Sequence, residues 1–429
     1  MPRRTSAPPL AITGLGLICP LGNTVAVALA NARLGTSGIR PYQSPWADPD
    51  DPLLRHRVGG TVEGFVPDAV LEPRLAERHE PATLYALAAA AEALAQAGLP
   101  DADGGDRIGV ALGAGLPGAE LWHRALAAAG GDRRPGSIAR MAAIAITGNA
   151  AVGQLALRHG LRGPSLGVAN ACAAGTSAVA LAMDQLRLGR ADAMLVGGCE
   201  SSMRSLMTYA SFIDAGMHVT RDPTDACTPF ARDRRGFVLA EGAGMLVVER
   251  LDRARARGAR VLGLLAGAAT TNDAHHVISP EPTGAAWART ITLALADAGV
   301  EPDEVDAISA HATATPAGDL AETRAIKRVF GARAGRLAVS ATKSMHGHAF
   351  GAAGAIELAL AVAAMAEGVV LPTIGLRTPD PACDLDYVPH AARQRAVGVL
   401  VKHGFGAGGV ATALVVRHPD ATPVATRSA

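Results

Sequence analysis

The sequence has 429 residues, of which 49% are hydrophobic, and its 40 Lys and Arg against 39 Asp and Glu give a formal net charge of +1. This length allows a large core in one unit or two fused domains, and the balanced charge makes nucleic acid an unfavourable partner. The five cysteines form no CxxC pair, which argues against a zinc site or a disulfide scaffold and indicates a reducing, cytoplasmic location.

Three strand-and-helix patterns follow one another in the first half of the chain. Residues 86–115 read as an Ala-rich helix, a turn and a strand; residues 164–189 as a short strand, a small-residue loop and an apolar helix; residues 191–201 as a buried strand entering a turn. Strands that alternate with helices predict parallel sheets covered by helices. The longest uncharged apolar stretch, residues 141–157, contains Gly, Asn and Gln, so we expect a buried helix and no membrane span.

The charged residues 249–260 predict a solvated helix, and after them the three patterns recur in the same order. Residues 288–315, 336–365 and 395–409 resemble the three earlier segments in turn. Chance could produce one such match, but three in order indicate a duplication. We therefore predict two α/β halves that pack as one body, residues 1–255 and residues 256–429.

Cys172, in VANACAAGTSA, lies in the loop between a predicted strand and a predicted helix. The carboxyl ends of parallel strands are where chemistry gathers in such folds, and backbone N–H groups and the helix dipole there are expected to stabilise a thiolate. Small neighbouring residues leave room for a substrate. The alternative is a buried structural cysteine.

Histidines mark two loops of the second half. His311 follows a strand in ISAHATATPAGD, and KSMHGHAFGAAG, with Lys343, His346 and His348, occupies the place that the loop of Cys172 holds in the first half. A pseudo-twofold arrangement would bring these loops to one site. No acidic or Cys ligand accompanies the two histidines of HGH, so no metal is predicted, and a hydrogen-bonded loop histidine is the alternative for His311.

A glycine-rich loop, GFGAGG at residues 404–409, follows the last predicted strand and offers free backbone N–H groups for an oxyanion hole. It matches GxGxxG, as does GAGLPG at residues 113–118. Pro117 and the lack of an early βαβ unit argue against a dinucleotide site at the first, and the chain ends before an acidic ribose partner could follow the second.

These four loops, with GLRGPSLGVANAC, PFARDRRGFVLAEGAGMLVVE and KSMHGHAFGAAGA, resemble the elongating β-ketoacyl-acyl carrier protein synthases of fatty acid and type II polyketide synthesis, from Ala11 to Gly409. The resemblance implies an α/β chain with the five-layered αβαβα thiolase fold, internally duplicated, as a homodimer or ketosynthase heterodimer. It implies an acyltransferase that condenses acyl and malonyl thioesters. No resident cofactor is implied, because the acyl carrier protein delivers the phosphopantetheine arm.

The resemblance also assigns roles to residues of these loops. Cys172 would be the nucleophile, and His311 and His348 would decarboxylate the malonyl group and stabilise its enolate. Lys343 would order the site, with Glu357 as its charge partner. The other implied roles are an oxyanion hole from the N–H groups of Cys172 and Phe405, a gate at Phe405, and pantetheine contacts from Thr313 and Thr315.

Some positions depart from the family pattern. Ala312 and Ala314 replace the glycines of HGTGT, GFGAGG lacks the Thr and Asn of GFGGTN, His346 replaces a small polar residue, and Ile278 takes a position often held by Thr. We interpret these as a changed tunnel and gate, which favours a polyketide or polyene pathway over housekeeping fatty acid synthesis. The alternatives are a non-catalytic partner like the chain-length factors, and a thiolase.

Two further expectations concern surfaces. The acyl pocket is expected along residues 116–122 and 136–141. A docking surface for an acidic carrier protein is expected among five arginines, with an ordinary solvated surface as the alternative: Arg204, Arg221, Arg232, Arg234 and Arg235.

Overall fold

The computed structural model of the chain describes residues 9–43, 57–67, 70–99, 105–131 and 142–421. Within these ranges, ten strands form one hydrogen-bonded sheet in the order β10-β9-β13-β14-β8-β1-β7-β6-β4-β5. The strands of that sheet are β1 (Leu10–Ile18), β4 (Ile108–Gly113), β5 (Ser165–Val168), β6 (Ala193–Glu200), β7 (Gly242–Arg250), β8 (Gly263–Asn272), β9 (Ala307–Ser309), β10 (Ala338–Ser340), β13 (Val399–Phe405) and β14 (Val410–Arg417).

Two short strand pairs lie outside this sheet, β2 (Ile39–Pro41) with β3 (Val58–Gly60) and β11 (Val369–Val370) with β12 (Arg393–Gln394). The helices are α1 (Val25–Arg33), α2 (Pro73–Ala76), α3 (Pro81–Ala97), α4 (Ala119–Gly131), α5 (Ala142–Ala145), α6 (Ala150–His159), α7 (Ala174–Arg187), α8 (Leu206–Asp214), α9 (Leu251–Ala256), α10 (Ala285–Ala298), α11 (Pro316–Phe330), α12 (Lys343–His346) and α13 (Phe350–Ala366).

The strand order confirms the duplication. The first half contributes β5-β4-β6-β7-β1 and the second β10-β9-β13-β14-β8, and the antiparallel pair β1 and β8 joins them. The expected parallel pairing holds for β4 with β5 and β6 and for β9 with β10 and β13, whereas β1, β7, β8 and β14 run antiparallel to their neighbours in the described sheet. The connection between β13 and β14 shows why strands can run antiparallel here. It is a turn of four residues, 406–409, and so short a connection can join only antiparallel neighbours.

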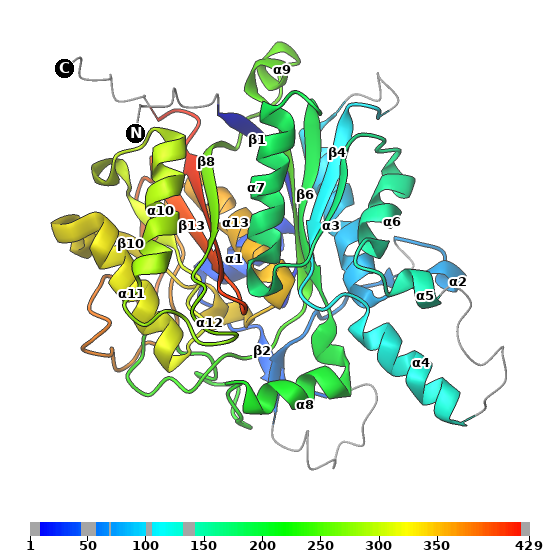
Figure 1. Cartoon of the computed structure of the whole chain (residues 1–429), viewed down its shortest axis with the longest axis horizontal. Helices are drawn as coiled ribbons and strands as arrows, with labels where there is room; N and C mark the ends of the chain where they lie inside the picture. The colour runs from blue at the N-terminus through cyan, green and yellow to red at the C-terminus, as the bar shows by residue number, and fades with distance from the viewer. Residues whose placement is uncertain (1–8, 44–56, 68–69, 100–104, 132–141, 422–429) are drawn as a thin grey trace.

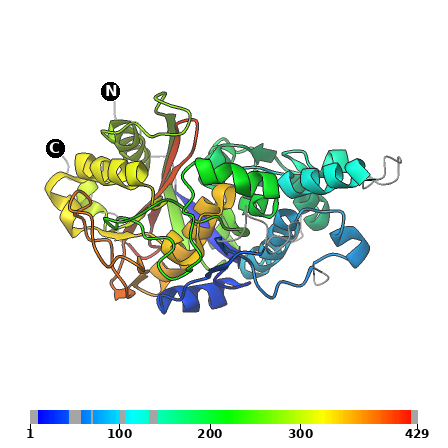
Figure 2. The ribbon, with the colours of Figure 1, turned by 90° about the horizontal axis from the view of Figure 1, so that it is seen from below.

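The helices complete the predicted five layers (Figure 1). From right to left in that view, α3 and α6 cover one half of the sheet, α7 and α13 lie between the halves, and α10 and α11 cover the other half. Glycine allows one of these close approaches, since a Cβ on Gly16 of β1 would lie 1.8 Å from the carbonyl oxygen of Ala89 in α3. The same layers seen from below place α4 at the far edge of the first half (Figure 2).

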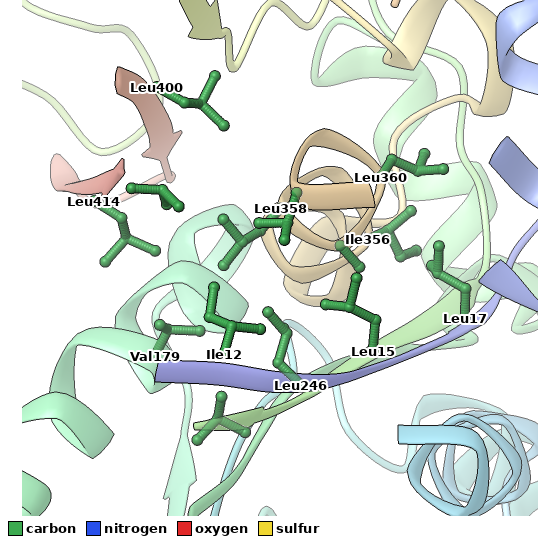
Figure 3. Packing of buried hydrophobic residues seen from close by; sticks show 14 of the residues in the cluster. Ile12, Leu15, Leu17, Val179, Leu246, Ile356, Leu358, Leu360, Leu400 and Leu414 are labelled. Carbon is green, nitrogen blue, oxygen red and sulfur yellow. The ribbon is translucent and has the colours of Figure 1, made fainter. Parts of the chain in front are cut away.

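One core fills the space between the two halves (Figure 3). Ile356 of α13 lies near Leu15 of β1, while Leu358 of the same helix points toward Leu414 of β14. Because α13 is surrounded by apolar side chains on nearly every side, its one charged residue, Glu357, is forced into the interior. This burial sets the electrostatics of the site described below.

The charged stretch 249–260 forms the end of β7 and the short helix α9, with ion pairs from Arg257 to Glu249 and from Arg250 to Asp252, as expected for a solvated helix. The proposed boundary at residue 255 falls within α9 and stays a prediction. No helix of the described ranges has both the length and the apolar character needed to span a bilayer.

Candidate active site

Cys172 lies in a tight turn between β5 and α7. Residues 171–173 form a single 3₁₀ turn, and Ala171 has a left-handed φ of 46°. The glycine-rich loop of the second half packs directly on this turn, because a Cβ on Gly406 would lie 2.9 Å from the Asn170 carbonyl oxygen and 3.2 Å from the Cys172 nitrogen. The two halves therefore meet at Cys172, as the repeat predicted.

The side chain of Cys172 faces an aromatic cluster. It is partly buried and packs against a group that includes Phe237 and Phe350. The same two rings flank His348, with centroids 5.9 Å and 4.9 Å from its imidazole. Cys172 and His348 thus line the same small volume.

His311 and His348 lie edge to face, with 5.5 Å between ring centroids and an interplanar angle of 87°. Both backbones are fixed: the N–H of His348 donates to Val238 O at 2.7 Å, and the N–H of His311 donates to Glu322 Oε1 at 2.7 Å. The three loops that carry Cys172, His311 and His348 are brought together as the sequence predicted.

Lys343 and Glu357 form a fully buried ion pair beneath the histidines, as expected. Lys343 Nζ also donates to the carbonyl oxygen of His311 at 2.5 Å, so it anchors the loop that carries this imidazole. His346 is buried, and its Nε2 lies 3.1 Å from Thr342 Oγ1.

Burial governs protonation in the site. It lowers the pKa of His311 and of His348 well below the usual range, and the nearby Lys343 charge lowers both further, so both imidazoles are uncharged at neutral pH. Burial raises the pKa of the Cys172 thiol to about 12, opposed by the Lys343 charge and by the backbone N–H groups of Ala407 and of Cys172 itself. The expectation of a stabilised thiolate was wrong, because desolvation outweighs these donors.

The remaining predicted residues surround this centre. The hydroxyls of Thr313 and Thr315 lie 3.0 Å apart on the loop after β9. Phe405 is buried and stacks on Trp287 of α10, and its ring and that of His311 lie edge to face. Ala312 and Ala314, which stand in place of glycines, have left-handed φ values of 35° and 62°. The backbone keeps the shape that glycine favours, and the alanines hold it under strain.

Several buried charged groups of the site were missed. Lys402 and His403 of β13 and Glu322 of α11 lie fully buried beside the histidine loops. Glu322 accepts hydrogen bonds from the backbone N–H groups of His311 and Ala312, and His403 Nδ1 lies 3.0 Å from its Oε1. One sequence signal could have found Lys402: the chain has only three lysines, one of which is Lys343.

Two of the five arginines proposed for docking are engaged inside the protein. Arg234 is buried and pairs with Asp380 at 2.6 Å, and Arg204 pairs with the buried Glu241 at 2.5 Å. Arg234 cannot offer a free charge to a partner, so the docking expectation was wrong for it, while Arg204 keeps 29% of its side chain exposed and stays a prediction. Arg221, Arg232 and Arg235 are exposed.

Of the two segments expected to line the acyl pocket, residues 116–122 run from a loop into α4, and residues 136–141 lie outside the described residues.

Comparisons with known proteins agree with this geometry. The β-ketoacyl synthase N-terminal domain matches residues 7–254 and the β-ketoacyl synthase C-terminal domain matches residues 262–377. A 3-oxoacyl-[acyl-carrier-protein] synthase 2 of Staphylococcus aureus strain N315 is 36% identical over 96% of this chain and 99% of its own length. The protein of the same description from Synechocystis is 39% identical over 93% of this chain and 95% of its own.

Solved structures give the same result. A chain of the complex between a type II polyketide acyl-carrier protein and its ketosynthase bound to the hexaketide superposes with a TM-score of 0.88, at 32% identity over 96% of this chain and all of that one. A chain of the ishigamide ketosynthase/chain length factor gives 0.85, at 32% identity over 96% of this chain and 99% of that one. The chain belongs to the β-ketoacyl synthase family. It is a condensing acyltransferase with the thiolase fold.

Proposed function

We propose that this chain elongates acyl groups by decarboxylative Claisen condensation, with Cys172 as the acyl carrier and malonyl-acyl carrier protein as the extender. The observation that carries the proposal is the meeting of the Cys172 turn with two buried, uncharged imidazoles, His311 and His348. Two uncharged N–H donors beside a thiol suit a reaction that makes an enolate next to an acyl thioester.

The first step would load the enzyme. Cys172 Sγ attacks the carbonyl carbon of an acyl thioester, and an uncharged imidazole of the site accepts the thiol proton. The carbon–sulfur bond to pantetheine then breaks, and the departing sulfur recovers that proton. Backbone N–H groups of Cys172 and Phe405 would hold the transient oxyanion. Because one thioester replaces another, the step needs no energy-rich co-reactant.

The second step would form the carbon–carbon bond. The malonyl carboxylate leaves as CO₂, and its bonding electrons become the enolate, whose oxygen accepts hydrogen bonds from His311 and His348. The enolate carbon attacks the acyl carbon on Cys172, the carbon–sulfur bond to Cys172 breaks, and the released thiolate takes up one proton from solvent to restore the thiol. Proximity favours this attack over escape of the enolate. The product is two carbons longer and carries a β-keto group.

The phosphopantetheine arm would belong to the carrier protein and not to this chain. The neighbouring hydroxyls of Thr313 and Thr315 support contacts to its amide groups. Arg221, Arg232 and Arg235 remain available for an acidic carrier protein. The strained alanines at 312 and 314 lie in the same loop, and their methyl groups support a changed arm passage and a polyketide or polyene pathway.

A second copy of the chain, or a related subunit, would cover the edge of the first half. The edge strand β5 is largely exposed, and beside it α4, α5 and α6 expose Leu126 (63%), Ile144 (58%) and Leu157 (78%). Unpaired strand edges and apolar side chains of this kind are expected to be buried in an assembly. A non-catalytic partner role for this chain itself is disfavoured, because such subunits lack the nucleophilic cysteine.

Replacement of the thiol tests the nucleophile. We expect Cys172→Ala to abolish the acyl adduct that intact mass spectrometry detects after incubation with acyl-carrier proteins. The buried Cys227 provides the matched control, since Cys227→Ala removes a sulfur outside the aromatic cluster that holds Cys172, and this variant should still be acylated. An adduct that persists in Cys172→Ala would reject the assignment.

A second variant separates the two steps. We expect His348→Ala to keep acylation of Cys172 while losing release of labelled CO₂ from malonyl-carrier protein by about 100-fold or more. Undiminished CO₂ release would remove His348 from decarboxylation without affecting the role of Cys172.

A further inference from the structure

Lysine is rare in this chain, and its placement is selective. Of the 40 basic Lys and Arg residues only three are lysines. Lys327 lies on the surface and pairs with Asp384. Lys343 and Lys402 are buried, with 1% and 0% of their surface exposed, and both contact the same carboxylate, that of Glu357. Lysine carries its charge as a compact ammonium group on a flexible four-carbon stem.

Glu357 therefore faces two positive charges. Lys343 pairs with its Oε1, and Lys402 Nζ lies 2.7 Å from its Oε2 while also donating to the carbonyl oxygen of His403. The other buried carboxylate nearby, Glu322, is occupied by the N–H groups of the His311 loop and by His403. The carboxylate of Glu357 carries one negative charge against two ammonium groups, so it balances the charge of one lysine and leaves that of the other uncompensated by this residue.

We propose that Lys402 is a positioning residue that acts through the two imidazoles: as the second buried positive charge beside Glu357, it keeps His311 and His348 uncharged and able to donate hydrogen bonds to the enolate oxygen. This proposal rests on the proposed function. Protonation of a buried imidazole near two ammonium groups is unfavourable, whereas the negative charge of the enolate is stabilised by them.

The electrostatics support this direction. Burial is the first cause of the lowered pKa of both histidines, Lys343 is the second, and Lys402 lowers both further. Burial lowers the pKa of Lys402 itself, and Glu357 opposes that shift. The other charged or titratable groups that face these side chains are Lys343 and His346 of α12, Glu357 of α13, Glu322 of α11 and His403 of β13.

The alternative is a purely structural ion cluster. A buried pair that loses one partner destabilises a protein strongly, so reduced activity alone cannot distinguish the two roles. The pH profile can. If Lys402 holds the imidazoles uncharged, its removal raises their pKa values, and activity is lost at a higher pH on the acid side.

The experiment measures CO₂ release from malonyl-carrier protein as a function of pH, on the full chain. Lys402→Met removes the charge at similar volume, and Lys402→Gln removes it but keeps a hydrogen-bond donor. For both we expect the acid-side midpoint to rise by about one pH unit. Lys402→Arg should return the midpoint toward that of the unchanged protein, and the matched surface variant Lys327→Met should not move it.

Each outcome decides the proposal. A rate lowered by the same factor at every pH, or loss of folded protein in both neutral variants, would assign Lys402 to stability alone and overturn it. Failure of the proposed function would look different, because the unchanged protein would then release no CO₂ from malonyl-carrier protein at any pH.

Discussion

The ring of Phe405 lies flat on the indole of Trp287, with 3.7 Å between centroids and 9° between planes. Phe405 is the last residue of β13 and directly precedes the loop that packs on the Cys172 turn, and Trp287 belongs to α10 on the outer side of the second half. The stack ties the proposed gate to a rigid helix. Movement of Phe405 must separate the two rings.

We therefore predict that the fluorescence of Trp287 changes when Cys172 becomes acylated. An acyl chain on the sulfur should displace Phe405 and change the surroundings of the buried indole. Stopped-flow emission after mixing with acyl-carrier protein measures this, and Trp287→Phe should remove the signal. Trp122 is half exposed and serves as the control, so a signal that vanishes only in Trp122→Phe would contradict the prediction.

The raised pKa of Cys172, to about 12, predicts a slow and pH-dependent thiol. Only the thiolate reacts with iodoacetamide, so the alkylation rate at Cys172 should rise about tenfold per pH unit between pH 7 and pH 9. Peptide mass spectrometry of the modified residue gives this rate. A rate that reaches a plateau within that range would mean a thiol pKa near or below its usual value.

The fold followed from the sequence because duplication is visible in residue patterns, whereas strand direction is not. The order of strand, loop and helix around Cys172 and His348 was sufficient to place both loops at one site. Nothing local in the sequence of β7 or β14 says that each runs antiparallel to its neighbours. Direction depends on the length and path of connections, and those paths are set by tertiary packing.

Buried charges were the least predictable feature of the site. Arg234 looks like a surface residue in RDRRGF, yet Asp380 and Asp319 enclose it. Lys402 comes at the end of a strand that the sequence predicts to be buried, but no residue near it in the sequence points to its charge partner. A charged side chain is normally solvated, so only its partners from distant segments justify its burial. Lys343 and Glu357 were anticipated through family resemblance, and not through periodicity.

The left-handed backbone at Ala314 predicts a stabilising substitution. An L-residue at φ 62° is strained by about 1–2 kcal/mol, whereas glycine adopts this conformation freely and loses part of that gain through its flexible unfolded chain. We expect Ala314→Gly to raise the free energy of unfolding by about 0.5–1 kcal/mol. Chemical denaturation measures it. Ala310→Gly, at a buried position without positive φ, should lower stability, and equal effects of both changes would rule out strain.

Two glutamates, one in the middle of α13 and one just after its end, allow the contribution of the buried ion cluster to stability to be measured. Glu357 is 1% exposed and contacts both Lys343 and Lys402, whereas Glu367, just after the helix, is 44% exposed and pairs with Arg33. Glu357→Gln leaves two buried ammonium groups without a counter-charge and should lower stability by about 3–5 kcal/mol. Glu367→Gln makes the same chemical change at the surface and should alter it by less than about 1 kcal/mol. Urea titration of both variants at neutral pH compares them, and similar losses would mean that solvent reaches Glu357 and screens the cluster that the site depends on.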